Sequence, residues 1–306
     1  MEKKLILKND HLQAEIRLPG SEPESQRFDS AAVISQVTLH GQHVFCQPEQ
    51  VFPERATCYG FGLCSEFVMD DVGKLARKGD FFPKPGVGLL RQIEDGRIYD
   101  KWSCYEEKKF AKAWENGEDW IIFREEPVVC LGIGLKIRRE MRLEENAILL
   151  NTIVENVGTE RAVLAEYQHN FVAIDNLPVG EGYCLEIPFD GTLPEMERSF
   201  TVLSTGEPLA DGCVRVEGSQ VRWIRTEPDR TWQKITEPED ILNCETYGWK
   251  LTHKDSPVSI AEVCGFKPAK LVLWGVEHCI CTEAYHGIDL LPGEKECFTR
   301  KWIFED

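Results

Sequence analysis

The chain has 306 residues and a formal net charge of −17, from 35 Lys and Arg residues against 52 Asp and Glu residues. A surface this negative repels nucleic-acid phosphates and anionic lipids, so we expect no nucleic-acid partner and no membrane partner. The first residues, MEKKLILKND, lack the apolar stretch of a signal peptide, and no apolar run approaches the roughly 18 residues of a membrane span.

Short alternating or apolar runs, separated by Gly, Pro, Asn and Asp, recur along the chain, and helical periodicity is scarce. Eleven such runs follow one another at spacings too short for parallel crossover units, which predicts an antiparallel all-β protein. At this length we expect one large β-sandwich domain over residues 1–306. The predicted strands lie at residues 12–18, 31–39, 119–123, 131–143, 147–157, 161–174, 221–225, 247–253, 259–266, 270–285 and 297–304.

The clearest predicted hairpin joins two long runs through Glu144, Glu145 and Asn146. Two segments, Lys74–Lys84 and Pro188–Gly218, are rich in turn residues and polar side chains. Long loops in a compact β domain are usually functional, so both segments are predicted rims of a binding cleft.

A histidine occupies an otherwise apolar strand face in the run EYQHNFVAID. Successive side chains of a strand point to opposite faces, so one face carries Val163, Ala165, Tyr167, His169, Phe171 and Ala173. Imidazole exchanges protons near neutral pH, whereas many buried histidines are merely hydrogen-bonded core residues. His169 is therefore a candidate acid that needs a partner base.

The C-terminal run LVLWGVEHCICTEAY provides the candidate base, Glu283, at the predicted end of a strand. Counted as one strand, the run places Cys279, Cys281 and Glu283 on one face and Trp274 on the other. Desolvation at such a position raises the pKa of a carboxylate toward that of a working base. The alternative is a surface glutamate beside a turn.

Several stretches, taken in order, resemble the galactose mutarotase-like (aldose 1-epimerase) superfamily. These are FPKPGVGLLR, REMRLEEN, NTIVENVG, EYQHNFVAID and ICTEAYHGIDLLPGEKECFTRKWIF. The shared order covers most of the chain. Two features typical of the superfamily, a second cleft histidine in an HGG motif and an Asn-Arg-Ile segment, are not apparent, and His40 is expected in a hairpin turn instead.

The resemblance implies a two-sheet β-supersandwich that binds a sugar and interconverts its α and β anomers. In that reaction His169 would protonate the ring oxygen and Glu283 would take the proton of the C1 hydroxyl, with no cofactor. A non-catalytic carbohydrate-binding protein and an epimerase acting on hexose 6-phosphates remain alternatives. The phosphate alternative requires a basic cluster, for which the chain offers Lys74, Arg77, Lys78, Lys84 and Arg91.

Secondary contacts with a sugar are predicted for Arg91 and Lys84, and by aromatic stacking for Trp249 and Trp274, with Trp102 as a further candidate. The alternatives are solvated charges for the two cations and core positions for the tryptophans. Glu66, in GFGLCSEF, either lines the mouth of the cleft or is a solvated strand-edge carboxylate.

No metal site is predicted. The 12 cysteines include no C-x-x-C pair, and the single C-x-C has no second half. A site of His278, Glu283 and His286 is conceivable, but His278 and Glu283 have opposite strand parity and cannot converge unless the chain bulges or turns between them. Reduced thiols in a cytoplasmic protein are the expectation, and the oligomeric state stays open.

Overall fold

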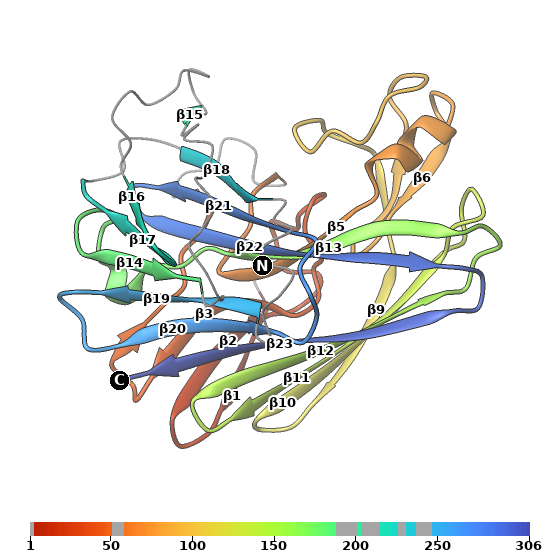
Figure 1. Ribbon diagram of the computed structural model, residues 1–306. Coiled ribbons are helices and arrows are strands. Elements are labelled where there is room, and N and C mark those ends of the chain that lie inside the picture. Colours follow the sequence, from red (N-terminus) through yellow and green to blue (C-terminus); the bar gives the residue numbers. More distant parts are fainter. Residues whose placement is uncertain (1–2, 51–57, 188–200, 203–213, 226–230, 237–246) are drawn as a thin grey trace.

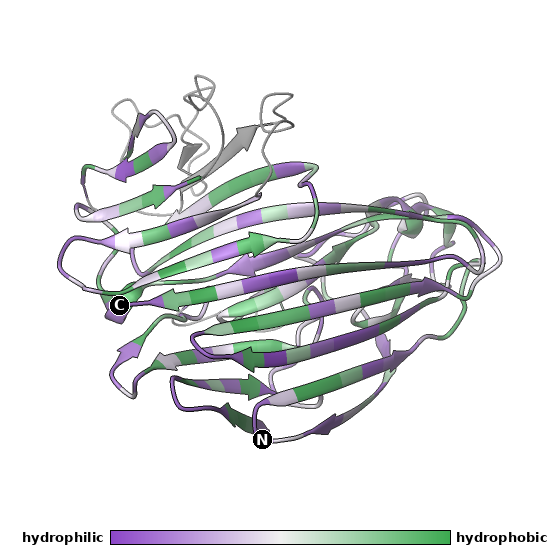
Figure 2. Cartoon of the chain, turned by 60° about the horizontal axis from the view of Figure 1, so that its bottom comes forward, coloured by the Kyte–Doolittle hydropathy of each residue, from purple (hydrophilic) through white to green (hydrophobic). Residues whose placement is uncertain are grey.

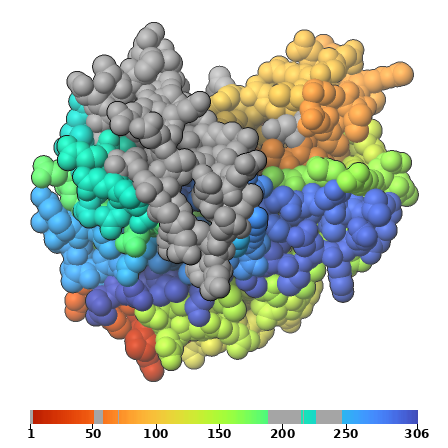
Figure 3. Space-filling model, viewed as in Figure 1, coloured from red at the N-terminus to blue at the C-terminus, as the bar shows by residue number. Residues whose placement is uncertain are grey.

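The computed structural model describes residues 3–50, 58–187, 201–202, 214–225, 231–236 and 247–306. In these ranges two large antiparallel sheets pack face to face, and a smaller lobe stands at the upper right of Figure 1 and of the space-filling view in Figure 3. The all-β sandwich expected from the alternating runs is confirmed. None of the helices in these ranges is both long and apolar enough to cross a membrane.

The first sheet has ten strands, which combine segments from both ends of the chain. In spatial order they are β1 (Lys4–Lys8), β2 (Leu12–Arg17), β3 (Val33–Leu39), β5 (Leu63–Val68), β13 (Ala162–Asn170), β22 (Cys279–Leu290), β21 (Lys270–Val276), β18 (Thr231–Thr236) and β15 (Thr201–Val202), with β4 (His43–Val44) paired to β3.

The second sheet also has ten strands and includes the long predicted hairpin, which turns at Glu145 with a positive φ of 52°. In spatial order they are β16 (Val214–Glu217), β17 (Gln220–Trp223), β14 (Tyr183–Glu186), β19 (Tyr247–His253), β20 (Ser259–Cys264), β23 (Lys295–Glu305), β12 (Ala147–Asn156), β11 (Leu135–Glu144), β10 (Trp120–Glu126) and β9 (Ala111–Asn116).

The smaller lobe is a three-stranded sheet of β6 (Phe81–Lys84), β7 (Gly88–Arg91) and β8 (Glu107–Lys109) with the 3-10 helix η2 (Asp70–Leu75). A second 3-10 helix, η3 (Ile174–Asn176), follows β13. The predicted rim segment 74–84 is therefore part helix and part strand. Most of the other predicted rim, Pro188–Gly218, lies outside the described residues.

The hydrophobic core fills the space between the two sheets. It combines side chains such as Ile34 and Val37 of the first sheet with Met141 and Leu150 of the second. Figure 2 shows apolar and polar segments alternating along the strands, as period-2 burial requires. We call the face of the first sheet that packs on this core its inner face, and the opposite one its outer face.

The predicted run 270–285 is two strands rather than one. Val276 pairs with Cys279, so the chain reverses at Glu277 and His278. Trp274 is consequently directly opposite Cys281 and shares its face, contrary to the parity expected for a single strand. Glu283 lies in the middle of β22 and not at a strand end, because β22 continues to Leu290.

A buried outer-face site with a histidine–glutamate pair

The register between β13 and β22 brings His169 and Glu283 together. Tyr167 is opposite Tyr285, and the same register relates Val172 to Ile280 further along. Extended between these pairs, it places His169 opposite Glu283. The predicted partners, more than a hundred residues apart in sequence, are thus neighbours on the outer face.

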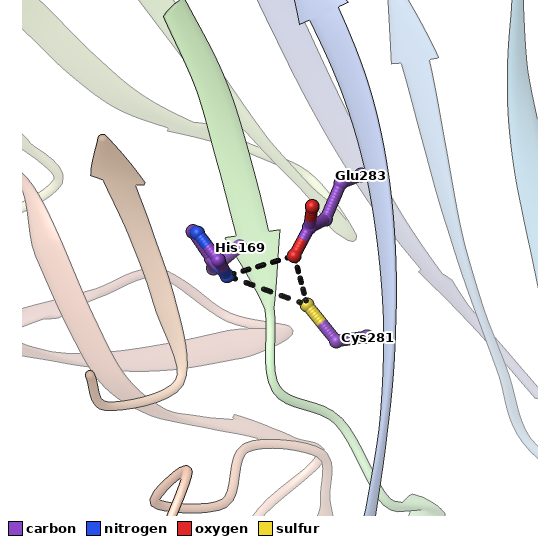
Figure 4. Close-up of side chains that lie close together, drawn as sticks. All are labelled: His169, Cys281 and Glu283. Carbon is purple, nitrogen blue, oxygen red and sulfur yellow. Dashed lines mark hydrogen bonds and ion pairs between the residues drawn. The ribbon is translucent and has the colours of Figure 1, made fainter. Parts of the chain in front are cut away.

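The two side chains are in direct contact. His169 Nδ1 lies 2.9 Å from Glu283 Oε1, and the residues are only 3% and 6% exposed (Figure 4). The roles predicted for the two groups require a pocket for one sugar between them, but in this structure nothing separates the two side chains. A sugar would have to replace this contact.

Each member of the pair shifts the pKa of the other toward its charged form. Burial lowers the pKa of His169, but the charge and hydrogen bond of Glu283 and the hydrogen bond of Glu66 raise it by more, leaving it above its usual value. Burial raises the pKa of Glu283, but His169 and then Arg27 lower it by more, so the raised pKa expected from desolvation is wrong. Both shifts favour a protonated imidazole beside an ionised carboxylate.

Glu66 is the site residue whose importance the sequence did not reveal. It is 3% exposed, and its pKa is lowered well below the usual value, because the charges of Arg27 and Lys84 outweigh the effect of burial. Its Oε2 accepts a hydrogen bond of 2.7 Å from Arg27 Nε and one of 2.5 Å from the Tyr167 hydroxyl. A strand-edge location was one alternative, but β5 lies inside the sheet next to β13.

Glu66 also holds the histidine. His169 Nε2 lies 3.3 Å from Glu66 Oε2 and 3.3 Å from Arg27 Nη2. Arg27 in turn lies near Glu49, with Nη1 3.6 Å from Oε1. Only the alternating parity of GFGLCSEF, which gives Glu66 and Cys64 one face, could have indicated this role in advance.

Aromatic rings surround the pair. The ring of Phe28 meets His169 edge-on at 4.8 Å, and Phe171 stacks on it at 5.2 Å. Tyr167 and Tyr285 stack at 4.0 Å, and the Tyr285 hydroxyl donates to Glu283 Oε2 at 3.1 Å. These rings exclude water and strengthen the electrostatic interactions inside.

The predicted secondary residues divide into two groups. Trp274 lies on the outer face, edge-on to Phe171 at 5.8 Å. Lys84 is buried and reaches the site through Glu66, with Nζ 3.4 Å from Oε1. Both belong to the site.

Trp249 and Arg91 do not belong to it. Trp249 is 2% exposed in the core between the sheets, where its Nε1 donates to Glu262 Oε2 at 2.7 Å. The prediction that it stacks on a sugar is wrong, because its ring is enclosed by core side chains. Arg91 pairs with Glu106 and lies over the ring of Phe81, so its guanidinium is already occupied.

One further lysine approaches the site from the loop after β7. The pKa of Lys101 is lowered, first by burial and then by the charge of Arg27, while Glu66 and Glu283 act in the opposite sense. The next residue, Trp102, is 40% exposed and meets Tyr59 edge-on at 6.1 Å. The segment therefore places an accessible aromatic ring at the rim.

Comparisons with known proteins support the fold. No family model matches the sequence, and no curated protein sequence matches it. A putative aldose 1-epimerase from Escherichia coli K12 superimposes with a TM-score of 0.60 at 10% identity, over 100% of this chain and 99% of that one. A galactose mutarotase-like protein from Lactobacillus casei gives 0.58 at 12% identity, over 99% and 100%.

An aldose epimerase homologue from Caenorhabditis elegans gives a TM-score of 0.57 at 12% identity, covering 100% of this chain and 99% of that one. At these identities the likeness establishes the architecture. The chain has the fold of the galactose mutarotase-like proteins, as the order of its motifs predicted.

Proposed function

We propose that the protein is a sugar mutarotase of the aldose 1-epimerase type, in which His169 is the general acid and Glu283 the general base. The observation that carries the proposal is the buried 2.9 Å contact between imidazole and carboxylate, and the pKa shifts of the two groups favour a protonated acid and an ionised base. Acid and base must lie side by side, because the two oxygens they act on are both bonded to C1 of the sugar.

In the proposed reaction the hemiacetal replaces the His169–Glu283 contact. His169 Nδ1–H protonates the ring oxygen while Glu283 takes the proton of the C1 hydroxyl, and the bond between C1 and the ring oxygen breaks. The open-chain aldehyde rotates about C1–C2. The ring oxygen then attacks the other carbonyl face, its proton returns to His169, and Glu283 returns its own proton to O1.

Each of the two groups would contribute about a hundred- to ten-thousandfold to the rate. Glu66 supports the reaction by holding Nε2, which leaves Nδ1 as the nitrogen that faces Glu283. Tyr285 does the same for the carboxylate by hydrogen-bonding Oε2. Both are positioning residues.

A neutral sugar fits the surroundings better than a sugar phosphate. Three cations of the predicted basic cluster are already paired: Lys74 with Asp71, Lys84 with Glu66 and Arg91 with Glu106. The other two, Arg77 and Lys78, are exposed. A phosphate group would have to compete with these carboxylates for its cations.

The test is saturation-transfer NMR of anomer exchange in neutral hexoses, pentoses and hexose 6-phosphates, with and without the protein. We expect the protein to accelerate exchange, and His169→Gln to lower the rate about a hundred- to ten-thousandfold. The matched control is His286→Gln, which removes a buried histidine paired with Glu296 at 2.7 Å on the inner face of β22. It should keep the activity.

Unchanged exchange in every sugar would overturn the proposal and favour a carbohydrate-binding protein without catalysis. Equal loss in both variants would show that His169 matters for folding rather than for proton transfer.

A further inference from the structure

Cys281 contacts the catalytic pair but has no part in the proposed proton exchange. Its free thiol is fully buried on β22, one position along the outer face from Glu283. The sulfur lies 3.7 Å from His169 Nδ1 and 3.5 Å from Glu283 Oε1. Figure 4 shows the three side chains pointing toward one another from β13 and β22.

The triangle of Nδ1, Oε1 and Sγ has the size of a zinc coordination site. With Zn–N, Zn–O and Zn–S bonds of about 2.0–2.1, 2.0–2.2 and 2.3 Å, the ligand atoms of a tetrahedral ion lie roughly 3.3–3.6 Å apart. The two distances to sulfur, 3.7 and 3.5 Å, are close to this range. The nitrogen–oxygen distance of 2.9 Å has to lengthen by about 0.4 Å.

The surrounding hydrogen bonds already select these ligand atoms. Glu66 Oε2 faces His169 Nε2 at 3.3 Å, the carboxylate–histidine arrangement that directs the other ring nitrogen to a metal. The Tyr285 hydroxyl donates to Glu283 Oε2 at 3.1 Å and so leaves Oε1 toward the triangle. The two non-ligating atoms are held, and the two ligating atoms face the sulfur.

The charges also suit a divalent ion. A thiolate of Cys281 and the carboxylate of Glu283 together neutralise a charge of +2, so that no net charge is added to the buried site. Arg27 Nη2 is an opposing cation 3.3 Å from His169 Nε2, and its charge is balanced by Glu66 and Glu49. A mixed nitrogen, sulfur and oxygen set favours zinc or cobalt over magnesium or calcium.

We propose that His169, Cys281 and Glu283 form a binding site for a zinc-type divalent ion, with the fourth ligand position left for a water molecule. When the ion binds, one proton leaves the His169–Glu283 pair and one leaves the Cys281 thiol. The ion takes the same Nδ1 and Oε1 as the sugar, so it acts as a reversible inhibitor. The binding is independent of the proposed function, and only the inhibition rests on it.

The direct test is titration of the full-length protein with Co²⁺, read by absorption. We expect a near-ultraviolet thiolate-to-cobalt charge-transfer band and the intense visible bands of a tetrahedral ion, saturating at one ion per chain. Calorimetry with Zn²⁺ should give the same stoichiometry. Absence of the band would overturn the proposal.

Two variants identify the sulfur. Cys281→Ala should abolish the charge-transfer band. The matched control is Cys264→Ala, because Cys264 is also buried beside a glutamate, with Sγ 3.9 Å from Glu262 Oε1, but has Arg300 as its other neighbour instead of a histidine. A band that survives in Cys281→Ala would place the cobalt at another thiol and overturn the proposal.

Two more variants keep the test decisive if Cys281→Ala does not fold. His169→Gln should likewise remove the tetrahedral spectrum, and Glu66→Gln should weaken cobalt binding about 10–100-fold through the ring nitrogen it holds. A spectrum unchanged in both would contradict the site.

The activity readout separates this inference from the proposed function. If the protein accelerates anomer exchange, Zn²⁺ should slow the exchange, a chelator should restore it, and Cys281→Ala should resist Zn²⁺. A wild-type enzyme indifferent to Zn²⁺ at concentrations that fill the site would refute the inhibition. A cobalt band in a protein without exchange activity would leave the site established and refute only the mutarotase proposal.

Discussion

Strand β13 separates two clusters of buried charged side chains, one on each of its faces. On the outer face, His169 contacts Glu283 and Glu66. On the inner face, Glu166 accepts a hydrogen bond of 2.6 Å from Arg300, which also binds Glu262 at 2.7 Å. Both clusters are buried, with exposures of 3–6% on the outer face and 0–1% on the inner face, and in both the carboxylates pair with a nitrogen group.

They differ in the cation. A guanidinium does not release its proton in a protein, whereas an imidazole does so near neutral pH. The inner cluster can therefore only hold the two sheets together, and the outer cluster can also transfer a proton. Burial and ion pairing alone do not distinguish a structural cluster from a reactive one, but the type of cation does.

The largest expected effect belongs to the outer cluster. Glu283→Gln keeps the size of the side chain but removes the base, so anomer exchange should fall about a hundred- to ten-thousandfold with little change in melting temperature. Saturation-transfer NMR and thermal unfolding measure the two quantities. If the melting temperature falls sharply while the activity per folded molecule is kept, the comparison between the faces fails.

The second largest effect is expected for the inner cluster. Arg300→Met leaves Glu166 and Glu262 buried without their shared cation, so the free energy of unfolding should drop by about 3–5 kcal/mol. Urea denaturation measures this loss. A drop below roughly 1 kcal/mol, typical of exposed ion pairs, would mean that the arginine is not what holds the sheets.

A fall in pH should reproduce part of this loss in the free energy of unfolding. Burial raises the pKa of Glu166, but the charges of Arg300 and Arg139 lower it by more, so its folded-state pKa lies below the unfolded value. The stability it contributes is complete above the unfolded pKa and disappears as the pH falls through the folded pKa. Unfolding free energies from about pH 6 to about pH 3 should decline less steeply in Glu166→Gln than in the wild type; equal slopes would contradict the assignment.

The two tryptophans allow a smaller, matched comparison. Trp249→Phe leaves Glu262 Oε2 without an indole donor, which should cost about 1–3 kcal/mol of stability and leave KM unchanged. Trp274→Phe, on the outer face, should instead raise KM for the sugar, by roughly 1 kcal/mol or about fivefold. If Trp249→Phe raised KM and Trp274→Phe lowered the stability instead, Trp249 would belong to the binding surface.

The smallest effect is expected for Arg91→Ala. The side chains of Arg91 and Glu106 are 42% and 60% exposed, and exposed ion pairs contribute about 0–1 kcal/mol. Activity should stay within about fivefold of the wild type, the change that corresponds to about 1 kcal/mol. A larger loss of activity would show that Arg91 leaves Glu106 to bind the substrate.

Local patterns in the sequence predicted much of the fold. Strand alternation identified the hairpin of β11 and β12 and put His169 on one face with Tyr167 and Phe171, while the order of the motifs predicted the architecture. His40 lies in the expected hairpin turn, with a φ of 50°. His286 is on the inner face with Glu296, away from Glu283, as parity required.

The amino-acid sequence thus determined which side chains of one strand share a face. Side chains of a strand alternate between its two faces with a period of two residues, and this alternation depends only on the local backbone conformation. The tertiary structure alone decided which strands are adjacent and which face is inward. That pairing placed Glu283 and Cys281 against His169, brought Arg27 and Glu66 to the same imidazole, and enclosed Trp249 in the core. Contacts between residues far apart in the chain depend on sheet register, which arises from packing of the whole molecule and not from any single segment.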